Sequence, residues 1–223
     1  MKKIGIVGGT FDPIHRTHLL LGIQAYEEYD LDEIWLIPAG DPYFKTEDRD
    51  NGRRITAGSH RLKMCRLAVS KDMRFRVLDL ELNKKGRTYT AETLRDLHDA
   101  YPEACFYFCM GADSLLSFEK WYHTEEILSL ATLLVALRPD ADCEAHKETQ
   151  GVALNELQIY AERICRQYGG AIHFLHMKES NLSSTDIRRQ LSDREWTDPE
   201  GSLPEGVLSY IRAEKLYENK ENG

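Results

Sequence analysis

The chain has 223 residues, of which 42% are hydrophobic and 30% charged, and its formal net charge is −8. This length allows one domain with a substantial core, and the acidic balance argues against broad, sequence-independent binding to nucleic acid. The five cysteines form no Cys-x-x-Cys pair, and no stretch approaches the roughly 18 apolar residues of a membrane span, so neither a disulfide framework nor a membrane protein is indicated. We therefore expect a cytoplasmic protein with a single domain over residues 1–223.

Apolar runs and helical patterns alternate along the chain. Strands are expected at residues 4–7, 33–38, 75–78, 104–110, 132–137 and 172–176. Helices are expected from residue 17 or 18 to about 31, and at 59–70, 92–99, 114–117, 124–130, 152–168, 183–190 and 204–214. The alternation predicts an α/β fold with a doubly wound, mainly parallel sheet. Residues 183–216 would form a C-terminal helical part of the same domain, followed by a frayed tail at 217–223.

The chain is organised around the turn that follows the first expected strand. Gly8 and Gly9 end that strand, and His15 and His18 stand three residues apart where the first helix begins. Glycines let a ligand approach the backbone, and a helix N-terminus offers N–H donors with about half a positive charge. Each imidazole can donate a hydrogen bond to a phosphate oxygen. This arrangement therefore favours a phosphate ligand over a plain strand–helix connection.

The turn lacks the spacing of two common phosphate-binding motifs. It has no Gly-x-Gly-x-x-Gly dinucleotide fingerprint, and no Gly-Lys-Ser/Thr of a P-loop follows. The string from Gly8 to His15, followed by His18, instead resembles the start of bacterial nicotinate-mononucleotide adenylyltransferases. These belong to the nucleotidyltransferase superfamily with the His-x-Gly-His signature, and Thr17 stands here in place of its glycine. The resemblance implies a Rossmann-like nucleotidyltransferase fold.

A second motif lies at residues 183–188. Ser183 or Ser184 can cap the helix, and Thr185 and Arg188 share its first turn, so hydroxyl, guanidinium and helix start together suit a polyphosphate. The motif resembles the family's Ile-Ser-Ser-Thr-x-x-Arg signature, with Leu182 in place of isoleucine. The resemblance implies that it holds the β- and γ-phosphates of ATP.

Two further pieces are assigned to ATP through the resemblance. Gly111 and Asp113 end the strand expected at 104–110 and match the family's Gly-x-Asp, where a carboxylate can accept hydrogen bonds from ribose hydroxyls. Lys45 matches the lysine of the family's Pro-Pro-His-Lys segment, although Tyr43 and Phe44 depart from it. A loop lysine could reach a phosphate when the loop closes.

The acceptor site is expected on a third group of residues. The segment at 88–94 resembles the family's Ser-Tyr-Thr-x-x-Thr-Leu, and a Trp-Tyr pair follows the Gly-x-Asp turn at the family's spacing. An indole can stack on a pyridine ring. The residues expected to bind nicotinate mononucleotide are Thr88, Tyr89, Thr90, Trp121, Tyr122 and Arg138.

The resemblance implies adenylyl transfer from ATP to nicotinate mononucleotide, which gives deamido-NAD and pyrophosphate by direct in-line displacement. His15, His18 and Arg188 would be catalytic, with no covalent nucleophile and no protein metal site. Mg²⁺ would arrive with ATP, held mainly by phosphates and water. The residues expected to bind ATP are Gly8, Gly9, Thr10, Phe11, Lys45, Gly111, Asp113, Ser184 and Thr185.

Other readings remain open at this stage. The acceptor could be nicotinamide mononucleotide, or phosphopantetheine as in a related family, although the Thr-Tyr-Thr and Trp-Tyr pieces argue against the latter. Thr17 would also fit a paralogue that binds nucleotides without turnover. A homo-oligomer is left open.

Overall fold

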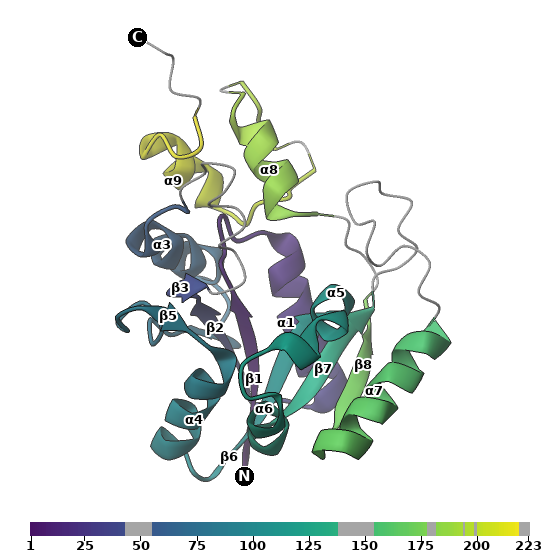
Figure 1. Cartoon of the computed structure of the whole chain (residues 1–223). Coiled ribbons are helices and arrows are strands. Elements are labelled where there is room, and N and C mark those ends of the chain that lie inside the picture. The colour runs from purple at the N-terminus through teal and green to yellow at the C-terminus, as the bar shows by residue number, and fades with distance from the viewer. Residues whose placement is uncertain (43–54, 138–153, 178–181, 194, 199, 219–223) are drawn as a thin grey trace.

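The computed structural model describes residues 1–42, 55–137, 154–177, 182–193, 195–198 and 200–218 (Figure 1). Within these residues a six-stranded sheet has the order β4-β2-β1-β6-β7-β8, and every neighbouring pair is parallel. Its strands are β1 (Lys2–Gly9), β2 (Glu33–Pro38), β4 (Phe75–Val77), β6 (Ala104–Gly111), β7 (Ala131–Leu137) and β8 (Ile172–His176). The predicted doubly wound α/β class is confirmed.

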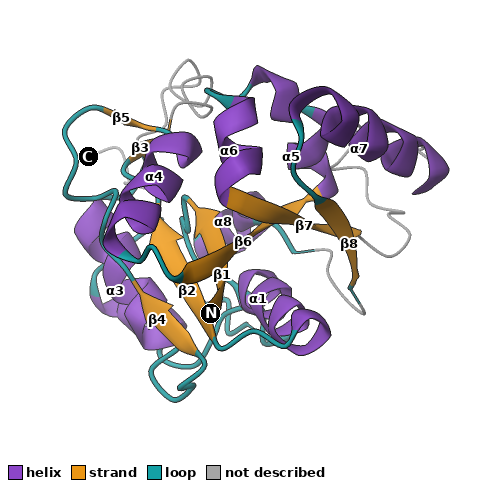
Figure 2. Ribbon diagram, turned by 90° about the horizontal axis from the view of Figure 1, so that it is seen from below, coloured by secondary structure: helices purple, strands orange, loops and turns teal. Residues whose placement is uncertain are grey.

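Helices cover both faces of this sheet (Figure 2). The helices are α1 (Arg16–Tyr29), α3 (Gly58–Ala68), α4 (Thr90–Ala100), α5 (Ala112–Leu116), the 3-10 helix η2 (Phe118–Lys120), α6 (Thr124–Leu130), α7 (Leu154–Tyr168), α8 (Ser184–Leu191) and α9 (Val207–Ala213). One buried cluster joins the sheet to α4, α5, α6 and α7, and the other joins it to α1, α3, α8 and α9. Burial on both faces explains why the central strands read as continuous apolar runs.

The C-terminal helices pack against the same sheet face as α1 and α3. Ile187 of α8 and Ile211 of α9 are fully buried in one cluster with Val7 of β1 and Leu134 of β7. The last helix is shorter than expected because Gly206, with a φ of 78°, is not helical, so α9 begins only at Val207. At the start of the expected tail, Tyr217 contacts the cluster.

Several element bounds differ from the expectations for local reasons. The helix expected at 114–117 begins at Ala112, because Gly111 in extended conformation serves as its N-cap. The helix expected at 92–99 begins at Thr90, with Tyr89 as its N-cap. A short parallel ladder between β3 (Asp41–Pro42) and β5 (Arg87–Thr88) was not predicted, because two-residue strands carry no periodic signal.

Candidate active site

A cavity of about 450 Å³ opens at the carboxyl ends of the strands. It lies where β1 and β6 are neighbours and the strand order runs outward in opposite directions, which is the position where doubly wound sheets bind ligands. Its walls include Gly8 and Gly9 of β1, Phe108 of β6 and His18 of α1. Its volume falls within the about 300–1,000 Å³ of small-molecule sites.

The glycine turn is shaped by an aromatic ring that folds back over it. Phe11 is 1% exposed and has a φ of 51°, a left-handed conformation that only a tightly packed surrounding maintains in a bulky residue. A Cβ atom at Gly9 would lie 3.0 Å from this ring, so a larger residue there would require the ring to shift. Phe11 is therefore buried as a whole, and its contact with ATP stays a prediction.

The two predicted histidines lie together at the start of α1. Their ring centroids are 3.8 Å apart, and the backbone N–H of His15 donates to Nδ1 of His18 over 3.2 Å. The accepting Nδ1 carries no proton, so the neutral His18 ring holds its proton on Nε2, where it is a hydrogen-bond donor. His18 lines the cavity, whereas His15 is only 4% exposed and packs against the His18 ring.

The helix start beside these histidines is partly occupied by the protein itself. The backbone N–H of Arg16, the first residue of α1, donates to the carbonyl of Ser202 over 2.8 Å. One of the N–H groups that the sequence offered to a phosphate is therefore already used by the C-terminal part of the chain.

The second predicted motif meets the first in space. Ser184 Oγ donates to the Pro13 carbonyl over 3.1 Å, and Arg188 Nη1 donates to the Asp12 carbonyl over 2.7 Å. Arg188 Nη2 also donates to Thr185 Oγ1 over 3.0 Å, so these two residues do share a face of α8. The structure thus brings together two motifs about 170 residues apart in the sequence and places a guanidinium and a hydroxyl against the glycine turn.

The N-terminal cap of α8 is Ser183, one of the two residues that the sequence offered for this position. Its Oγ accepts the backbone N–H of Asp186 over 3.1 Å and donates to the Asp186 carboxylate over 2.5 Å. This cap leaves the Ser184 hydroxyl to hold the turn.

Arg61 of α3 binds the backbone of the glycine turn, and nothing in the sequence analysis assigned it to the site. It is 2% exposed and donates from Nη1 to the Thr10 carbonyl over 2.7 Å and from Nε to the Thr56 carbonyl over 2.9 Å. Burial lowers the pKa of its guanidinium, and the nearby Asp12 carboxylate opposes that shift. A signal existed, because Arg61 stands at helical spacing from the buried Met64 and Cys65.

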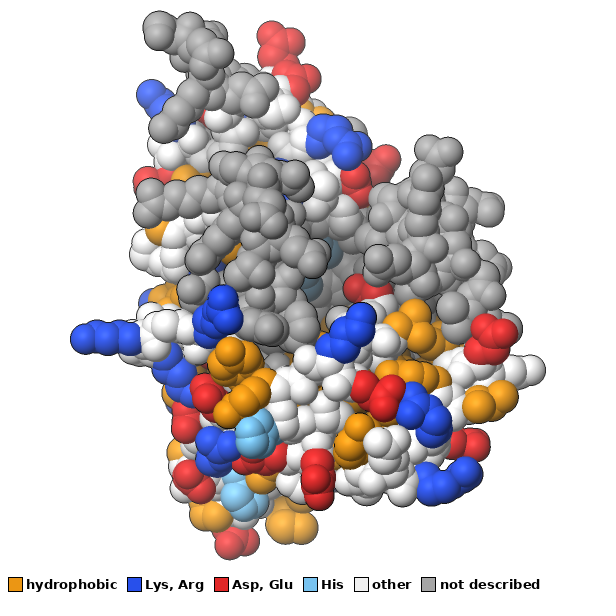
Figure 3. All heavy atoms as spheres, viewed as in Figure 1, with side chains coloured by type: hydrophobic (Ala, Val, Ile, Leu, Met, Phe, Trp, Pro, Cys, Tyr) orange, Lys and Arg blue, Asp and Glu red, His pale blue; other side chains and the backbone are white. Residues whose placement is uncertain are grey.

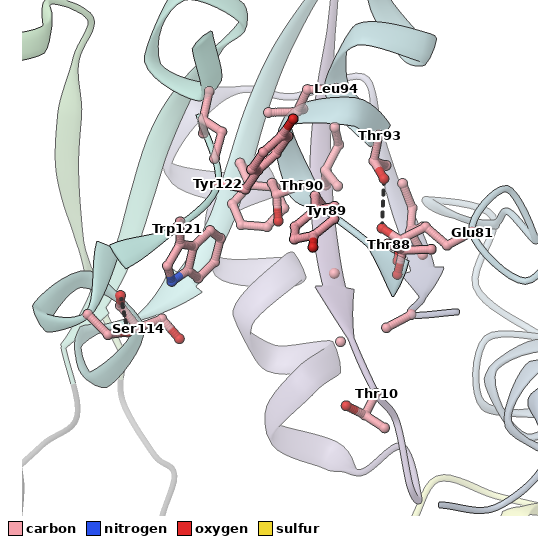
Figure 4. A pocket seen from close by; sticks show the side chains of 18 of the residues that line it. Thr10, Glu81, Thr88, Tyr89, Thr90, Thr93, Leu94, Ser114, Trp121 and Tyr122 are labelled. Carbon is pink, nitrogen blue, oxygen red and sulfur yellow. Dashed lines mark hydrogen bonds between the residues drawn. The ribbon is translucent and has the colours of Figure 1, made fainter. Parts of the chain in front are cut away.

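Aromatic and hydroxyl side chains form the wall of the cavity that lies away from the glycine turn (Figure 4). Trp121 is half-buried and packs edge-on against Phe108 at 6.1 Å between ring centroids, while the Tyr89 and Tyr122 rings lie 4.5 Å apart. Trp121 and Tyr122 follow η2, whereas Tyr89 precedes α4. The structure therefore gathers this predicted group from two separate segments.

Thr88 is the polar residue of this wall that gives evidence for a ligand site. It is 6% exposed, and its Oγ1 is buried without a hydrogen-bond partner among the described residues. A buried hydroxyl without a partner costs about 1–3 kcal/mol. A ligand in the cavity that offered a donor or an acceptor would remove this cost.

Glu81 is a further wall residue that the sequence analysis missed. Its carboxylate accepts the Thr93 hydroxyl over 2.8 Å and the backbone N–H of Gly40 over 3.3 Å (Figure 4). It therefore joins the segment after β2 to α4 across the cavity. It stands between Leu80 and Leu82 in a stretch where apolar and polar residues alternate, a pattern that fits a solvent-facing carboxylate equally well.

The strand end at β6 holds Asp113 in the cavity wall. Its side chain is exposed in the first turn of α5, and a Cβ atom at Gly111 would collide with its Oδ1. Glycine at 111 thus leaves room for this carboxylate. Lys45 and Arg138, the remaining predicted site residues, lie outside the described residues.

The described surface carries charged side chains of both signs. On the face shown in Figure 3, acidic and basic side chains are interspersed over the described surface without an extended basic area.

Among the described residues, His, Cys, Asp and Glu form no group of three or more that could hold a metal ion. In the same residues, every helix is too short or too polar to cross a membrane.

Comparisons with known proteins agree with this geometry. Residues 6–190 match the model of the cytidylyltransferase-like family. The chain is 34% identical, over 97% of both chains, to a probable nicotinate-nucleotide adenylyltransferase of Oceanobacillus iheyensis. It is 36% identical to one of Lachnoclostridium phytofermentans, over 97% of this chain and all of the relative. A solved Plasmodium falciparum nicotinic acid mononucleotide adenylyltransferase complexed with NaAD shares the fold at 19% identity, with a TM-score of 0.71 over 97% of this chain and 98% of that one.

Proposed function

Because the chain belongs to the cytidylyltransferase-like family, we propose that its cavity transfers the adenylyl group of ATP to nicotinate mononucleotide in NAD biosynthesis. The products are deamido-NAD and pyrophosphate. The observation that carries the proposal is the contact between the glycine turn and α8. Ser184 donates a hydrogen bond to the Pro13 carbonyl, and Arg188 donates one to the Asp12 carbonyl. That contact places the Arg188 guanidinium and the N-terminus of α8 beside the glycine turn, a combination suited to a triphosphate.

The reaction we propose is a direct displacement at the α-phosphorus of ATP. A phosphate oxygen of nicotinate mononucleotide forms the new P–O bond, the bond from the α-phosphorus to the bridging oxygen breaks, and pyrophosphate leaves with the electron pair. No side chain becomes covalently attached. Catalysis then rests on positioning and on stabilising negative charge at the phosphates.

Each catalytic role follows from where a donor lies. His18 would donate from Nε2 to the phosphate that reacts, with its ring fixed by the hydrogen bond from His15. Arg188, Thr185 and the start of α8 would hold the leaving pyrophosphate. Gly8, Gly9, Thr10 and Asp113 would take the nucleoside part of ATP, since these residues line the cavity at the ends of β1 and β6.

The aromatic wall is our candidate acceptor site. Trp121 offers a stacking surface for a pyridine ring, and the buried Thr88 hydroxyl offers a hydrogen bond that the described protein residues leave unused. Tyr89, Thr90 and Tyr122 complete the wall. Lys45 and Arg138 stay predicted phosphate and acceptor contacts.

The donors around the turn suit a metal that arrives with the nucleotide. They are cationic or hydroxyl groups, and both Asp12 carboxylate oxygens already accept hydrogen bonds, from Tyr217 and from Thr56. Mg²⁺ bound to ATP would therefore be held by phosphate oxygens and water, where it neutralises charge on the triphosphate. We further propose that the chain, residues 1–223, forms one domain, because α8 and α9 pack in the same buried cluster as β1 and α1. The cytoplasmic location and the oligomeric state stay predictions.

The test compares acceptors in one assay. Enzyme, ATP and Mg²⁺ are incubated separately with nicotinate mononucleotide, nicotinamide mononucleotide and phosphopantetheine, and both pyrophosphate and the adenylylated product are measured by mass spectrometry. We expect the highest kcat/KM with the nicotinate nucleotide. Higher turnover with another acceptor would reassign the substrate, and ATP binding without pyrophosphate release for any acceptor would support a non-catalytic paralogue.

A further inference from the structure

Tyr217 reaches the glycine turn from beyond the last helix. Its hydroxyl donates to Asp12 Oδ1 over 2.7 Å, across 205 residues of sequence. Its backbone φ is 66°, a conformation that a bulky residue keeps only where its contacts hold it. Burial above all, and then the Asp12 carboxylate, raise the pKa of Tyr217, so the phenol stays a donor throughout the physiological range.

Asp12 links this tyrosine to the site. Asp12 is 3% exposed, its carbonyl accepts Arg188 Nη1 over 2.7 Å, and its second carboxylate oxygen accepts the Thr56 backbone N–H over 3.4 Å. The Tyr217 phenol therefore binds the side chain of Asp12, while the Arg188 guanidinium binds its backbone carbonyl. A shift of the Asp12 backbone would therefore move the carbonyl that orients Arg188 together with the carboxylate that Tyr217 holds.

We propose that Tyr217 is a positioning residue for adenylyl transfer, which holds the Asp12 carbonyl and, through it, the Arg188 guanidinium at the triphosphate. The inference rests on the proposed function of Arg188. Tyr217 acts on the ATP side of the site, because its partner Asp12 also holds Arg188, which we assign to the leaving pyrophosphate. Its loss should therefore affect ATP and leave the acceptor nucleotide unaffected.

The chain offers a matched control for a purely structural role. Tyr210 of α9 also makes a long-range hydrogen bond with its hydroxyl, to His60 Nδ1 over 2.8 Å, and so joins α9 to α3. Tyr210→Phe deletes the same atom from the same part of the chain, away from the glycine turn. Loss of anchoring alone would make the two variants behave alike.

The experiment measures steady-state kinetics for wild type, Tyr217→Phe and Tyr210→Phe, together with their thermal unfolding. For Tyr217→Phe we expect kcat/KM for ATP to fall about tenfold, the lower end of what a hydrogen bond to a charged group contributes. We expect KM for nicotinate mononucleotide to change less than twofold, and Tyr210→Phe to keep both values within about twofold. Asp12→Asn leaves the phenol in place and weakens its acceptor, and should show the same ATP-selective loss.

A double-mutant cycle with Arg188→Ala separates positioning from general destabilisation. In the Arg188→Ala background, Tyr217→Phe should cause less than a further twofold loss, because the group that it positions is absent. Equal losses in both backgrounds, equal effects on both substrates, or wild-type kinetics in Tyr217→Phe would each overturn the inference. If wild type itself releases no pyrophosphate, the proposed function has failed, and the same cycle is then read from the Kd of a non-hydrolysable ATP analogue.

Discussion

Thr17 offers the most informative substitution, because it stands where the family signature has glycine. It is the second residue of α1, between His15 and His18, and its Oγ1 is buried without a hydrogen-bond partner among the described residues. Leaving a buried hydroxyl unsatisfied costs about 1–3 kcal/mol. Thr17→Val keeps the branched shape and removes the hydroxyl, so it should raise the free energy of unfolding by about 1–2 kcal/mol.

Thermal unfolding in the absence of nucleotide measures this effect. For a chain of this size, 1 kcal/mol shifts Tm by about 2–4 °C, so Thr17→Val should raise Tm by about 2–8 °C. Thr17→Gly also removes the hydroxyl, but glycine within a helix costs up to about 1 kcal/mol, so its Tm should stay close to wild type. If threonine is a tolerated replacement, Thr17→Gly should leave kcat/KM for ATP within about threefold, below 1 kcal/mol of transition-state stabilisation.

Two results would contradict this reasoning. A lower Tm for Thr17→Val would mean that the hydroxyl has a partner in the folded protein. A large gain in kcat/KM for Thr17→Gly would mean that the threonine side chain obstructs the nucleotide.

The remaining predictions concern the turn, the cavity wall and the core. Arg188→Lys keeps the charge but cannot reproduce the paired hydrogen bonds to Asp12 and Thr185, so steady-state kinetics should show kcat/KM for ATP falling about 10- to 100-fold. Gly40→Ala would drive a methyl group into the Glu81 carbonyl, and calorimetry should show a loss of about 1–3 kcal/mol. Burial raises the pKa of Cys109 to about 12. Its thiol stays protonated in the folded protein while the unfolded chain ionises, so this contribution is complete below about pH 9 and is lost above it, by about 1.4 kcal/mol per pH unit. Urea unfolding from pH 8 to 10.5 should show this slope, reduced in Cys109→Ala.

The site was predictable where its signals are local. Thr185 and Arg188 are three residues apart, and helical geometry alone places them on one face. Gly9 and Asp113 follow two strands of the expected parallel sheet, and the carboxyl ends of such strands meet at one edge, so the order of elements alone indicates a shared site. These steps need only spacing and the order of elements.

The parts that the sequence did not reveal depend on long-range contacts. Tyr217 was expected to fray with the tail, but its hydroxyl meets a buried carboxylate from the other end of the chain. The helical spacing of Arg61 from Met64 and Cys65 could indicate burial, but only its three backbone acceptors at Thr10, Gly40 and Thr56 show why a cation is buried there. No pattern of periodicity or propensity specifies such partners.

The central claim is that the glycine turn and its histidine pair stabilise adenylyl transfer. Single-turnover formation of deamido-NAD from saturating ATP, Mg²⁺ and nicotinate mononucleotide tests it in wild type, in His18→Ala, and in His98→Ala, which removes an exposed histidine of α4. We predict a loss of about a hundredfold in His18→Ala, or roughly 2.7 kcal/mol of transition-state stabilisation, with His98→Ala close to wild type. An unchanged rate in His18→Ala, or no product from wild type, would contradict the account.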